Sequence, residues 1–416
     1  MAWIRSPRVA AGGALAWLAT FASGCFDPTD TQAAETSSGG SGSSSVGTVA
    51  SNSASVGSES GSTSTSPTTT ATATTMADSS GDASSSVGDP CANLVCGTVD
   101  GHDCGSCPQG ECVANLACCT AAAVVTSFDT PGDAVNLAVT GGRAYVADYE
   151  SLRIIDVSDP SAPSELGAAP GSITWDVAVA GGHAYLARAY GGVVVVDVAD
   201  PGSPSEVGAA LDALSIGVDV DGNTAYFAGG SGYDAGVVDV SNPAMPQLLG
   251  SVAFTQQVPR VTIEGSHLFV PVEGDGVRVV DVANPAAPVE VGFVESQGYP
   301  RDVDIVGNDA FASVAYVGLT VLDVTEPDDP LPRAELMLDD NAGELEGLAV
   351  SGGLAALAQG ATGVRFVDVD DPAAPIDLGA LPIGGEAHDV EIAGDHAFIA
   401  AGSAGLVVVS LPQCAS

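Results

Sequence analysis

The side chains of this 416-residue sequence that could bind a ligand or do chemistry interrupt a repeated pattern in its later part. They combine aromatic rings with guanidinium, imidazole and carboxylate groups, and they are Tyr149, Trp175, Asp176, Arg188, Tyr190, Tyr233, Arg260, Arg301, Asp302, His388 and Asp389. Binding surfaces favour tyrosine, tryptophan and arginine, so this set indicates molecular recognition. The aspartates also admit a structural interpretation, in which they only accept hydrogen bonds from backbone amides and hold neighbouring repeats together.

The elements that must position these side chains form a repeat. An aspartate ends an apolar run at intervals of 41 to 45 residues, and a serine takes its place in the last unit: Asp156, Asp197, Asp239, Asp281, Asp323, Asp368 and Ser410. Each unit holds short β-branched runs bounded by glycine and by Asx-Pro turns, which is typical of strands. Four antiparallel strands per unit and seven units predict an all-β fold, a seven-bladed β-propeller over residues 122–416.

The last unit ends after three strands, so the ring needs a strand from elsewhere. Ala123–Gly132 ends in the Pro-Gly that also follows the fourth strand of the first unit, and we expect it to pair with Leu406–Ser410. Aligned on the repeat, Cys119 and Cys414 fall at the tip of this same hairpin. We predict a disulfide between Cys414 and Cys119, or its neighbour Cys118, in place of the missing turn.

In a propeller the inner strands begin at the face where the loops between second and third strands gather. The candidate side chains therefore should surround the mouth of the central channel, and loops on a rigid scaffold commonly carry function. We expect a non-catalytic binding or adhesion module that contacts an extracellular protein or glycan through this face.

The repeated region carries no Gly-x-Ser-x-Gly elbow, no His-Glu-x-x-His pair and no phosphate-binding loop before a helix. We expect no catalytic residue, no metal site and no cofactor, apart from diffuse binding of divalent cations such as calcium. The alternative is a hydrolase or lactonase-like enzyme with a carboxylate-bound metal in the channel. Arg260 and Arg301 share the ring of positions that would have to bind such a cation, which counts against the alternative.

The segments "LRIIDVSDP" at Leu152–Pro160 and "VRVVDVANP" at Val277–Pro285 show the most regular form of the repeat. In these segments the repeat resembles the signature of the LVIVD-repeat family of bacterial surface β-propellers. The resemblance covers most of the chain after Ala122 and implies the propeller fold and a surface location. It implies no common activity.

The N-terminal part predicts export. Residues 1–24 combine Arg5 and Arg8 with an apolar segment and small residues, as a secretory signal does. Cys25 follows "ASG" and resembles the lipidated cysteine of bacterial lipoproteins, although Ala22 replaces the usual leucine, so plain secretion is the alternative. We expect an outer-membrane or cell-surface lipoprotein. Residues 25–88 form a Ser/Thr/Gly-rich linker whose composition is typical of disorder.

Residues 89–121 should form a small disulfide-stapled module, because the segment is dense in cysteine and follows an export signal. Its cysteines are Cys91, Cys96, Cys104, Cys107, Cys112, Cys118 and Cys119. A redox pair at Cys104–Cys107 and a zinc site are weaker alternatives, since the first lacks its βαβ context and an exported chain meets an oxidant before a metal.

The composition limits the partners. The chain has 52 acidic and 10 basic residues, all of the latter arginine, for a formal charge of −42. Nucleic acid binding needs a basic surface, so we exclude it. The membrane should be contacted through the lipid anchor only, and we expect a monomer.

Overall fold

The computed structural model describes residues 98–99, 102–103, 119–210, 214–229, 232–338 and 345–414, with side chains for 121–210, 214–229, 232–338 and 345–412. The proposed signal segment, Cys25, the linker and most of the cysteine-rich module lie outside the described residues. In that module only a two-stranded pairing is described, β1 (Thr98–Val99) with β2 (His102–Asp103). The described residues contain no helix, and hence none that could cross a membrane.

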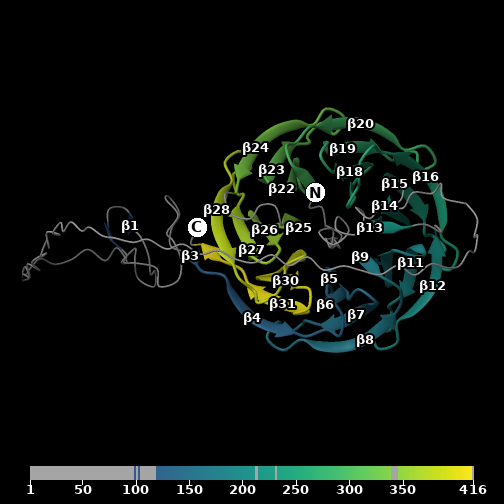
Figure 1. The fold of residues 1–416 in the computed structure, drawn as a ribbon, viewed down its shortest axis with the longest axis horizontal. Coiled ribbons are helices and arrows are strands. Elements are labelled where there is room, and N and C mark those ends of the chain that lie inside the picture. The colour runs from purple at the N-terminus through teal and green to yellow at the C-terminus, as the bar shows by residue number, and fades with distance from the viewer. Residues whose placement is uncertain are drawn as a thin grey trace, which may run out of the picture. The chain divides into compact units, whose positions relative to one another are not determined.

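Seven four-stranded antiparallel sheets are arranged as blades around a central channel, which confirms the predicted propeller (Figure 1). Blade 1 consists of β5 (Asn136–Thr140), β6 (Arg143–Ala147), β7 (Ser151–Asp156) and β8 (Ser164–Pro170). Blade 2 consists of β9 (Thr174–Ala180), β10 (His183–Arg188), β11 (Gly192–Asp197) and β12 (Ser205–Ala210). Blade 3 consists of β13 (Ser215–Asp221), β14 (Thr224–Gly229), β15 (Asp234–Asp239) and β16 (Gln247–Ala253).

Blade 4 consists of β17 (Thr262–Glu264), β18 (His267–Val272), β19 (Gly276–Asp281) and β20 (Val289–Val294). Blade 5 consists of β21 (Tyr299–Val306), β22 (Asp309–Ala315), β23 (Gly318–Asp323) and β24 (Leu331–Met337). Blade 6 consists of β25 (Leu345–Ser351), β26 (Leu354–Gln359), β27 (Gly363–Asp368) and β28 (Ile376–Leu381). Blade 7 consists of β29 (Asp389–Ala393), β30 (His396–Ala400), β31 (Leu406–Ser410) and β4 (Ala123–Phe128). The first strands named in neighbouring blades contact one another all the way around the channel, and Figure 1 labels β5, β9, β13 and β25 beside it.

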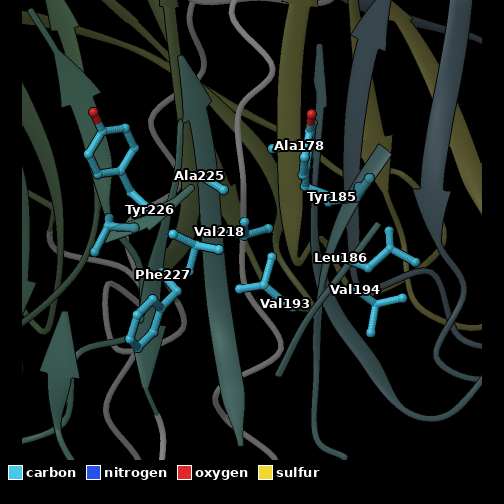
Figure 2. Packing of buried hydrophobic residues seen from close by; sticks show 14 of the residues in the cluster. Ala178, Tyr185, Leu186, Val193, Val194, Val218, Ala225, Tyr226 and Phe227 are labelled. Atoms are coloured by element: carbon cyan, nitrogen blue, oxygen red, sulfur yellow. The ribbon is translucent and has the colours of Figure 1, made fainter. Parts of the chain in front are cut away.

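The core lies between neighbouring blades, where the three inner strands of each sheet bury small and β-branched side chains. Figure 2 shows this packing between blades 2 and 3, with Leu186 and Val193 on one side and Val218 and Phe227 on the other. Strands of this kind read as nearly continuous apolar runs because both faces of the sheet are covered. Burial on both faces makes each blade a rigid support for the loops at its ends.

An aspartate caps the turn after the third strand of blades 1 to 6. In blade 1 the carboxylate of Asp156 accepts the amide N–H of Ser158, two residues on, at 2.9 Å. The same bond recurs at Asp197, Asp239, Asp281, Asp323 and Asp368. The aspartate that defines the repeat in the sequence is therefore an Asx cap, which reverses the chain between third and fourth strands.

The turn of one blade packs against a glycine of the blade before it. In all seven blades the pairing of third and fourth strands shifts register by one residue, and a glycine commonly stands at this bulge. A Cβ atom on Gly250 of blade 3 would lie 2.8 Å from the carbonyl oxygen of Pro285, in the turn of blade 4. Gly292 of blade 4 approaches Pro327 of blade 5 in the same way, at 2.9 Å. At Gly250 and Gly292 a glycine is required because the turn of the next blade comes too close for a side chain.

The ring closes as the sequence predicts. β4 pairs antiparallel with β31, so the N-terminal strand completes blade 7. Beyond it, β3 (Cys119–Thr120) pairs with β32 (Gln413–Cys414), and the register places Cys119 opposite Cys414. This backbone pairing stands where the other blades have the covalent Asx-Pro turn.

Candidate functional site

One residue from each blade forms a ring inside the channel, here called the inner ring: Asn136, Asp176, Gly217, Arg260, Asp302, Gly347 and Asp389. Its oxygen-bearing side chains accept hydrogen bonds from amides of the next blade around the ring. The bonds are Val177 N to Asn136 Oδ1 at 3.2 Å, Val218 N to Asp176 Oδ2 at 2.8 Å, Leu348 N to Asp302 Oδ2 at 2.9 Å, and Leu137 N to Asp389 Oδ2 at 3.1 Å. The aspartates thus have the structural role that the sequence left open.

Arg260 lies among these carboxylates with its side chain 2% exposed. Its Nη1 donates to Asp302 of the neighbouring blade 5 at 2.8 Å and to Asp389 of blade 7 at 3.3 Å. Two glycines of the ring make room for these groups. A Cβ on Gly217 would lie 2.9 Å from the Cα of Arg260, and one on Gly347 would lie 2.8 Å from the Cα of Asp389. Side chains at these two positions would collide with the network.

Burial governs protonation in the inner ring. It raises the pKa of Asp176 to about 7, although Arg260 and two amide hydrogen bonds oppose the shift. It also raises the pKa of Asp302, and that of Asp389 well above the usual value. Burial disfavours the charged form of Arg260, but the three carboxylates outweigh it and raise the pKa of this residue. A guanidinium occupies the space between the acids, and no set of three or more His, Cys, Asp or Glu side chains among the described residues is placed to hold a metal ion.

The exposed aromatic residues gather at one end of the ring, here called the mouth face. It is the end where the inner strands begin and where second and third strands are joined. Five of the eight tyrosines lie there: Tyr149, Tyr190, Tyr233, Tyr299 and Tyr316. Tyr190 is 76% exposed and Tyr316 68% exposed, whereas Tyr145, Tyr185 and Tyr226 are buried in second strands.

Backbone strain is concentrated in the same tyrosines. Tyr149, Tyr233 and Tyr316 have φ angles of 51°, 50° and 70°, and no other non-glycine residue among those described has a positive φ. A bulky residue in this region costs free energy, and such strain clusters at functional sites. All three belong to the loops between second and third strands, in blades 1, 3 and 5.

A pocket of about 920 Å³ opens at the mouth face over blades 7, 1, 2 and 3; we call it the mouth pocket. Four lining residues occupy one register position, three places before the inner ring: Glu386, Asp133, Ile173 and Leu214. Three more lie directly before the ring: His388, Val135 and Trp175. Loops supply Tyr149, Ala189, Tyr190, Gly402 and Ser403, and Gly385 completes the lining. Its volume and apolar lining are those of a small-ligand site.

Two aromatic rings form one wall of this pocket. The ring of Tyr149 stands edge-on to that of Trp175, at 5.8 Å between centroids and 88° between planes. The strained backbone of Tyr149 is fixed by a hydrogen bond from Thr174 N to its carbonyl oxygen at 2.6 Å. The strand that carries Trp175 therefore also anchors the loop that carries Tyr149, and the two rings are positioned as a unit.

A buried carboxylate holds the segment that carries one of the acidic residues of the rim. Asp148 accepts the amide N–H of Gly132 at 3.1 Å and is paired with the Nε of Arg153 at 3.2 Å. Gly132 immediately precedes Asp133, whose exposed carboxylate lines the pocket. Arg153 and Asp148 thus position Asp133 without touching the pocket themselves.

His388 is the one basic residue of the lining, and it is 6% exposed. Its Nδ1 lies 2.9 Å from Oε2 of the buried Glu346. Burial disfavours the imidazolium, but the hydrogen bond to Glu346 and the charges of Glu346, Glu386 and Asp133 raise the pKa of His388 above its usual value. The raised pKa extends the pH range over which His388 carries a positive charge beside the pocket.

A family model for the LVIVD repeat matches residues 131–169, 171–212, 215–253, 257–296 and 384–410. These are blades 1 to 4 and the three strands of blade 7 that follow one another in sequence. With the seven-bladed ring, this decides the family. The protein is an LVIVD-repeat β-propeller. The unmatched stretch, residues 297–383, forms blades 5 and 6 of the same ring. No curated protein matches this LVIVD-repeat propeller.

Solved structures share the fold at low sequence identity. The β-propeller domain of Myceliophteria thermophila Cps50 (Swd1) is similar with a TM-score of 0.57 at 11% identity, over 70% of this chain and 100% of that one. U3-55K has a TM-score of 0.56 at 13% identity, over 70% and 98% of the two chains. The computationally designed Ika8 protein has a TM-score of 0.53 at 12% identity, over 69% and 99%. These similarities show the fold of the LVIVD-repeat propeller and no more.

The structure brings together some of the residues expected from sequence and separates others. Tyr149, Trp175, Tyr190 and His388 line the mouth pocket of the LVIVD-repeat propeller. Asp176, Arg260, Asp302 and Asp389 are buried in the inner ring. Arg188 pairs with Glu206 at 2.8 Å, Arg301 pairs with Glu273, and Tyr233 lies half-exposed on blade 3, all outside the pocket lining.

Sequence reasoning missed other residues of the mouth face. The carboxylates of Asp133 and Glu386 and the aromatic pair Tyr299 and Tyr316, 5.7 Å apart between ring centroids, were not anticipated. A signal for most of them was present, because Asp133, Glu386 and Tyr299 all stand three places before the inner ring. Extending the repeat alignment back by three residues would have found them.

Proposed function

We propose that this LVIVD-repeat propeller is a non-catalytic binding or adhesion module that recognises its ligand at the mouth face. The observation that carries the proposal is the concentration of five tyrosines at this face, three of them with strained backbones, beside an apolar pocket. Tyrosine and tryptophan supply large contact areas at low entropic cost, which is why binding surfaces favour them. Backbone strain at equivalent loops of three blades is consistent with selection for side-chain position rather than for stability.

The partner that fits an exported protein is an extracellular protein, peptide or glycan. The chain would be held at the outer membrane or cell surface by a lipid on Cys25, a residue outside the described part of the structure. Replacing Cys25 by Ser should move the protein from the membrane to the soluble fraction. Unchanged membrane partition would contradict the anchor but leave the binding proposal intact.

The binding proposal is tested by an array experiment. The full chain is applied to arrays of glycans, peptides and extracellular proteins, together with Tyr190→Ala and Tyr316→Ala variants. Met245→Ala is the matched control, since Met245 is 64% exposed but lies in an Asx-Pro turn at the opposite end of blade 3. Loss of a specific signal in either tyrosine variant, with the control unchanged, supports the mouth face. A signal that all three variants retain would place recognition elsewhere.

A further inference from the structure

We propose that the mouth pocket binds an organic cation, an ammonium or guanidinium group carried on an apolar body, an inference that rests on the proposed binding function. The pocket combines three features that suit such a ligand: an apolar cavity, aromatic rings and an acidic rim. Different side chains supply the apolar wall, the aromatic rings and the acidic rim, so substitutions can remove one feature at a time.

The apolar body would lie against Val135, Ile173 and Leu214, which belong to three successive blades. Their side chains, together with Trp175 and Tyr149, make the pocket wall mainly hydrophobic. A cavity of about 920 Å³ is large enough to surround a drug-sized molecule or one to two side chains of a peptide. Burial of an apolar body here supplies affinity without regard to charge.

The charge of the lining selects the ligand's head group. Asp133 and Glu386 stand at equivalent positions of adjacent blades, both exposed at the rim, and among the described residues no arginine lines the pocket. The chain contains no lysine at all. His388 is the single basic group of the lining, and it is paired with Glu346 rather than with either rim acid. An anionic ligand would meet two carboxylates and no free cation, whereas a cationic one would be attracted.

The aromatic side chains add a second attraction for a cation. Trp175 and Tyr149 line the cavity and Tyr190 stands 76% exposed above it. Faces of such rings attract ammonium and guanidinium groups, and Trp is the strongest of them. Aromatic rings with nearby carboxylates are the arrangement that recognises quaternary ammonium ligands elsewhere.

Two sources could provide this chemistry: a free amine, or the lysine or arginine side chain of a peptide. Both are tested by calorimetry with the full chain. The free-amine probe is 4-phenylbutylammonium, with 4-phenylbutan-1-ol as the neutral isostere and 4-phenylbutyrate as the anionic one. The peptide probe is acetyl-Ala-Arg-Phe-Ala-amide, compared with the same peptide carrying norleucine in place of arginine.

The cationic probe should bind about tenfold or more tightly than its neutral isostere, and the anionic one more weakly than either. Asp133→Asn combined with Glu386→Gln should reduce this preference to the part that the aromatic rings supply and leave affinity for the neutral probe unchanged. The control is Glu326→Gln combined with Glu335→Gln, which changes the net charge equally at exposed acids away from the mouth face. The source of the cation is identified by which probe binds more tightly: 4-phenylbutylammonium for a free amine, or the arginine peptide for a peptide side chain.

The fluorescence of Trp175 reports independently on where the probe binds, because the other two tryptophans, Trp3 and Trp17, lie in the proposed signal segment. Binding should change tryptophan emission, and Trp175→Phe should abolish the optical change while calorimetric binding persists. Equal affinity for cationic and neutral probes, or a preference for the cationic probe that the double acid substitution leaves undiminished, overturns the cation proposal while the mouth face stands as a binding surface. Absence of binding by every probe also overturns it, and the array experiment then decides the binding function separately.

Discussion

The guanidinium of Arg260 in blade 4 reaches the carboxylate of Asp389 in blade 7, at 3.3 Å, so one side chain links two blades that are not neighbours in the ring. It also bonds Asp302 of blade 5 at 2.8 Å. Blade 7 is where β4 pairs with β31 to close the ring, so Arg260 links the blade that closes the ring to the opposite side of the channel.

Replacing Arg260 by Met should lower the free energy of unfolding by roughly 3–5 kcal/mol, because it leaves buried carboxylates without their counter-charge. The control is Arg333→Met, whose side chain is 28% exposed and pairs with Asp309 and Asp323 at the surface. That change should cost about 1 kcal/mol or less. Urea unfolding of both variants measures the difference. Equal decreases in the free energy of unfolding would contradict a structural role for the inner ring.

Asp176 should make stability depend on pH. Its folded pKa is raised to about 7 from an ordinary value of 3.8, so the folded state holds a proton that the unfolded state loses. The free energy of unfolding therefore falls as pH rises from about 4 to about 7, by at most about 1.4 kcal/mol per pH unit from this group. Asp176→Asn should flatten the curve, since Asn136 shows that an amide oxygen accepts the same inter-blade bond. Parallel curves for the two proteins would contradict this.

The pH dependence of cation binding should report on His388. As pH falls through its raised pKa, an imidazolium forms beside the rim, and although Glu346 partly compensates it, repulsion should weaken binding of 4-phenylbutylammonium. The acids that face this imidazole are Glu346, Glu386 and Asp133. His388→Gln should bind the probe with little change over the same range. If the wild-type affinity for 4-phenylbutylammonium rises as the pH falls, the prediction that protonated His388 weakens cation binding is wrong.

The bulge glycines should resist substitution wherever a turn packs on them. Gly250→Ala places a methyl group 2.8 Å from both the carbonyl oxygen of Pro285 and the Cδ of Pro288, and overpacking of this kind costs roughly 1–3 kcal/mol. Ala334 occupies the equivalent place in blade 5, so Ala334→Gly is the opposite test and should cost no more than about 1 kcal/mol. Thermal unfolding distinguishes them, and a neutral Gly250→Ala would refute the close approach.

A disulfide between Cys119 and Cys414 should close blade 7. Their backbones are register partners in β3 and β32, and partners in an antiparallel pair lie within the Cα separation that a disulfide spans. Cys414→Ser should lower stability by up to about 5 kcal/mol under oxidising conditions and leave it unchanged in reductant. Peptide mapping without reduction provides the direct check. Cys414 recovered as a free thiol, or joined to Cys91 or Cys96, would exclude this closure.

The fold could be predicted from sequence because its rules are local and repeated. The Asx cap after each third strand, exemplified by Asp156, and the missing fourth strand of the last unit were both visible as pattern. Only part of the mouth pocket could be predicted from sequence, because its walls form where equivalent positions of four blades converge in space. Asp133 and Glu386 carry no distinctive motif, and their importance follows from the cavity they border.

The role of Arg260 could not be read from sequence for a different reason. Whether its guanidinium faces solvent or spans the channel depends on the channel's width and on the space left by Gly217 and Gly347. The left-handed backbones of Tyr149, Tyr233 and Tyr316 were hidden as well, since the surrounding loops impose them against the residues' own preference. Both features arise from the closed ring as a whole.

The closure of blade 7 has a directional consequence. β4 meets β31 with Phe128 opposite Leu406 near the mouth face and Ala123 opposite Ser410 at the far end, so the chain enters the ring from the far end. The described chain therefore joins the propeller at the end away from Tyr190 and Trp175. Any attachment made through the N-terminal side of the chain would reach the propeller at that end and leave the mouth pocket unobstructed by the junction.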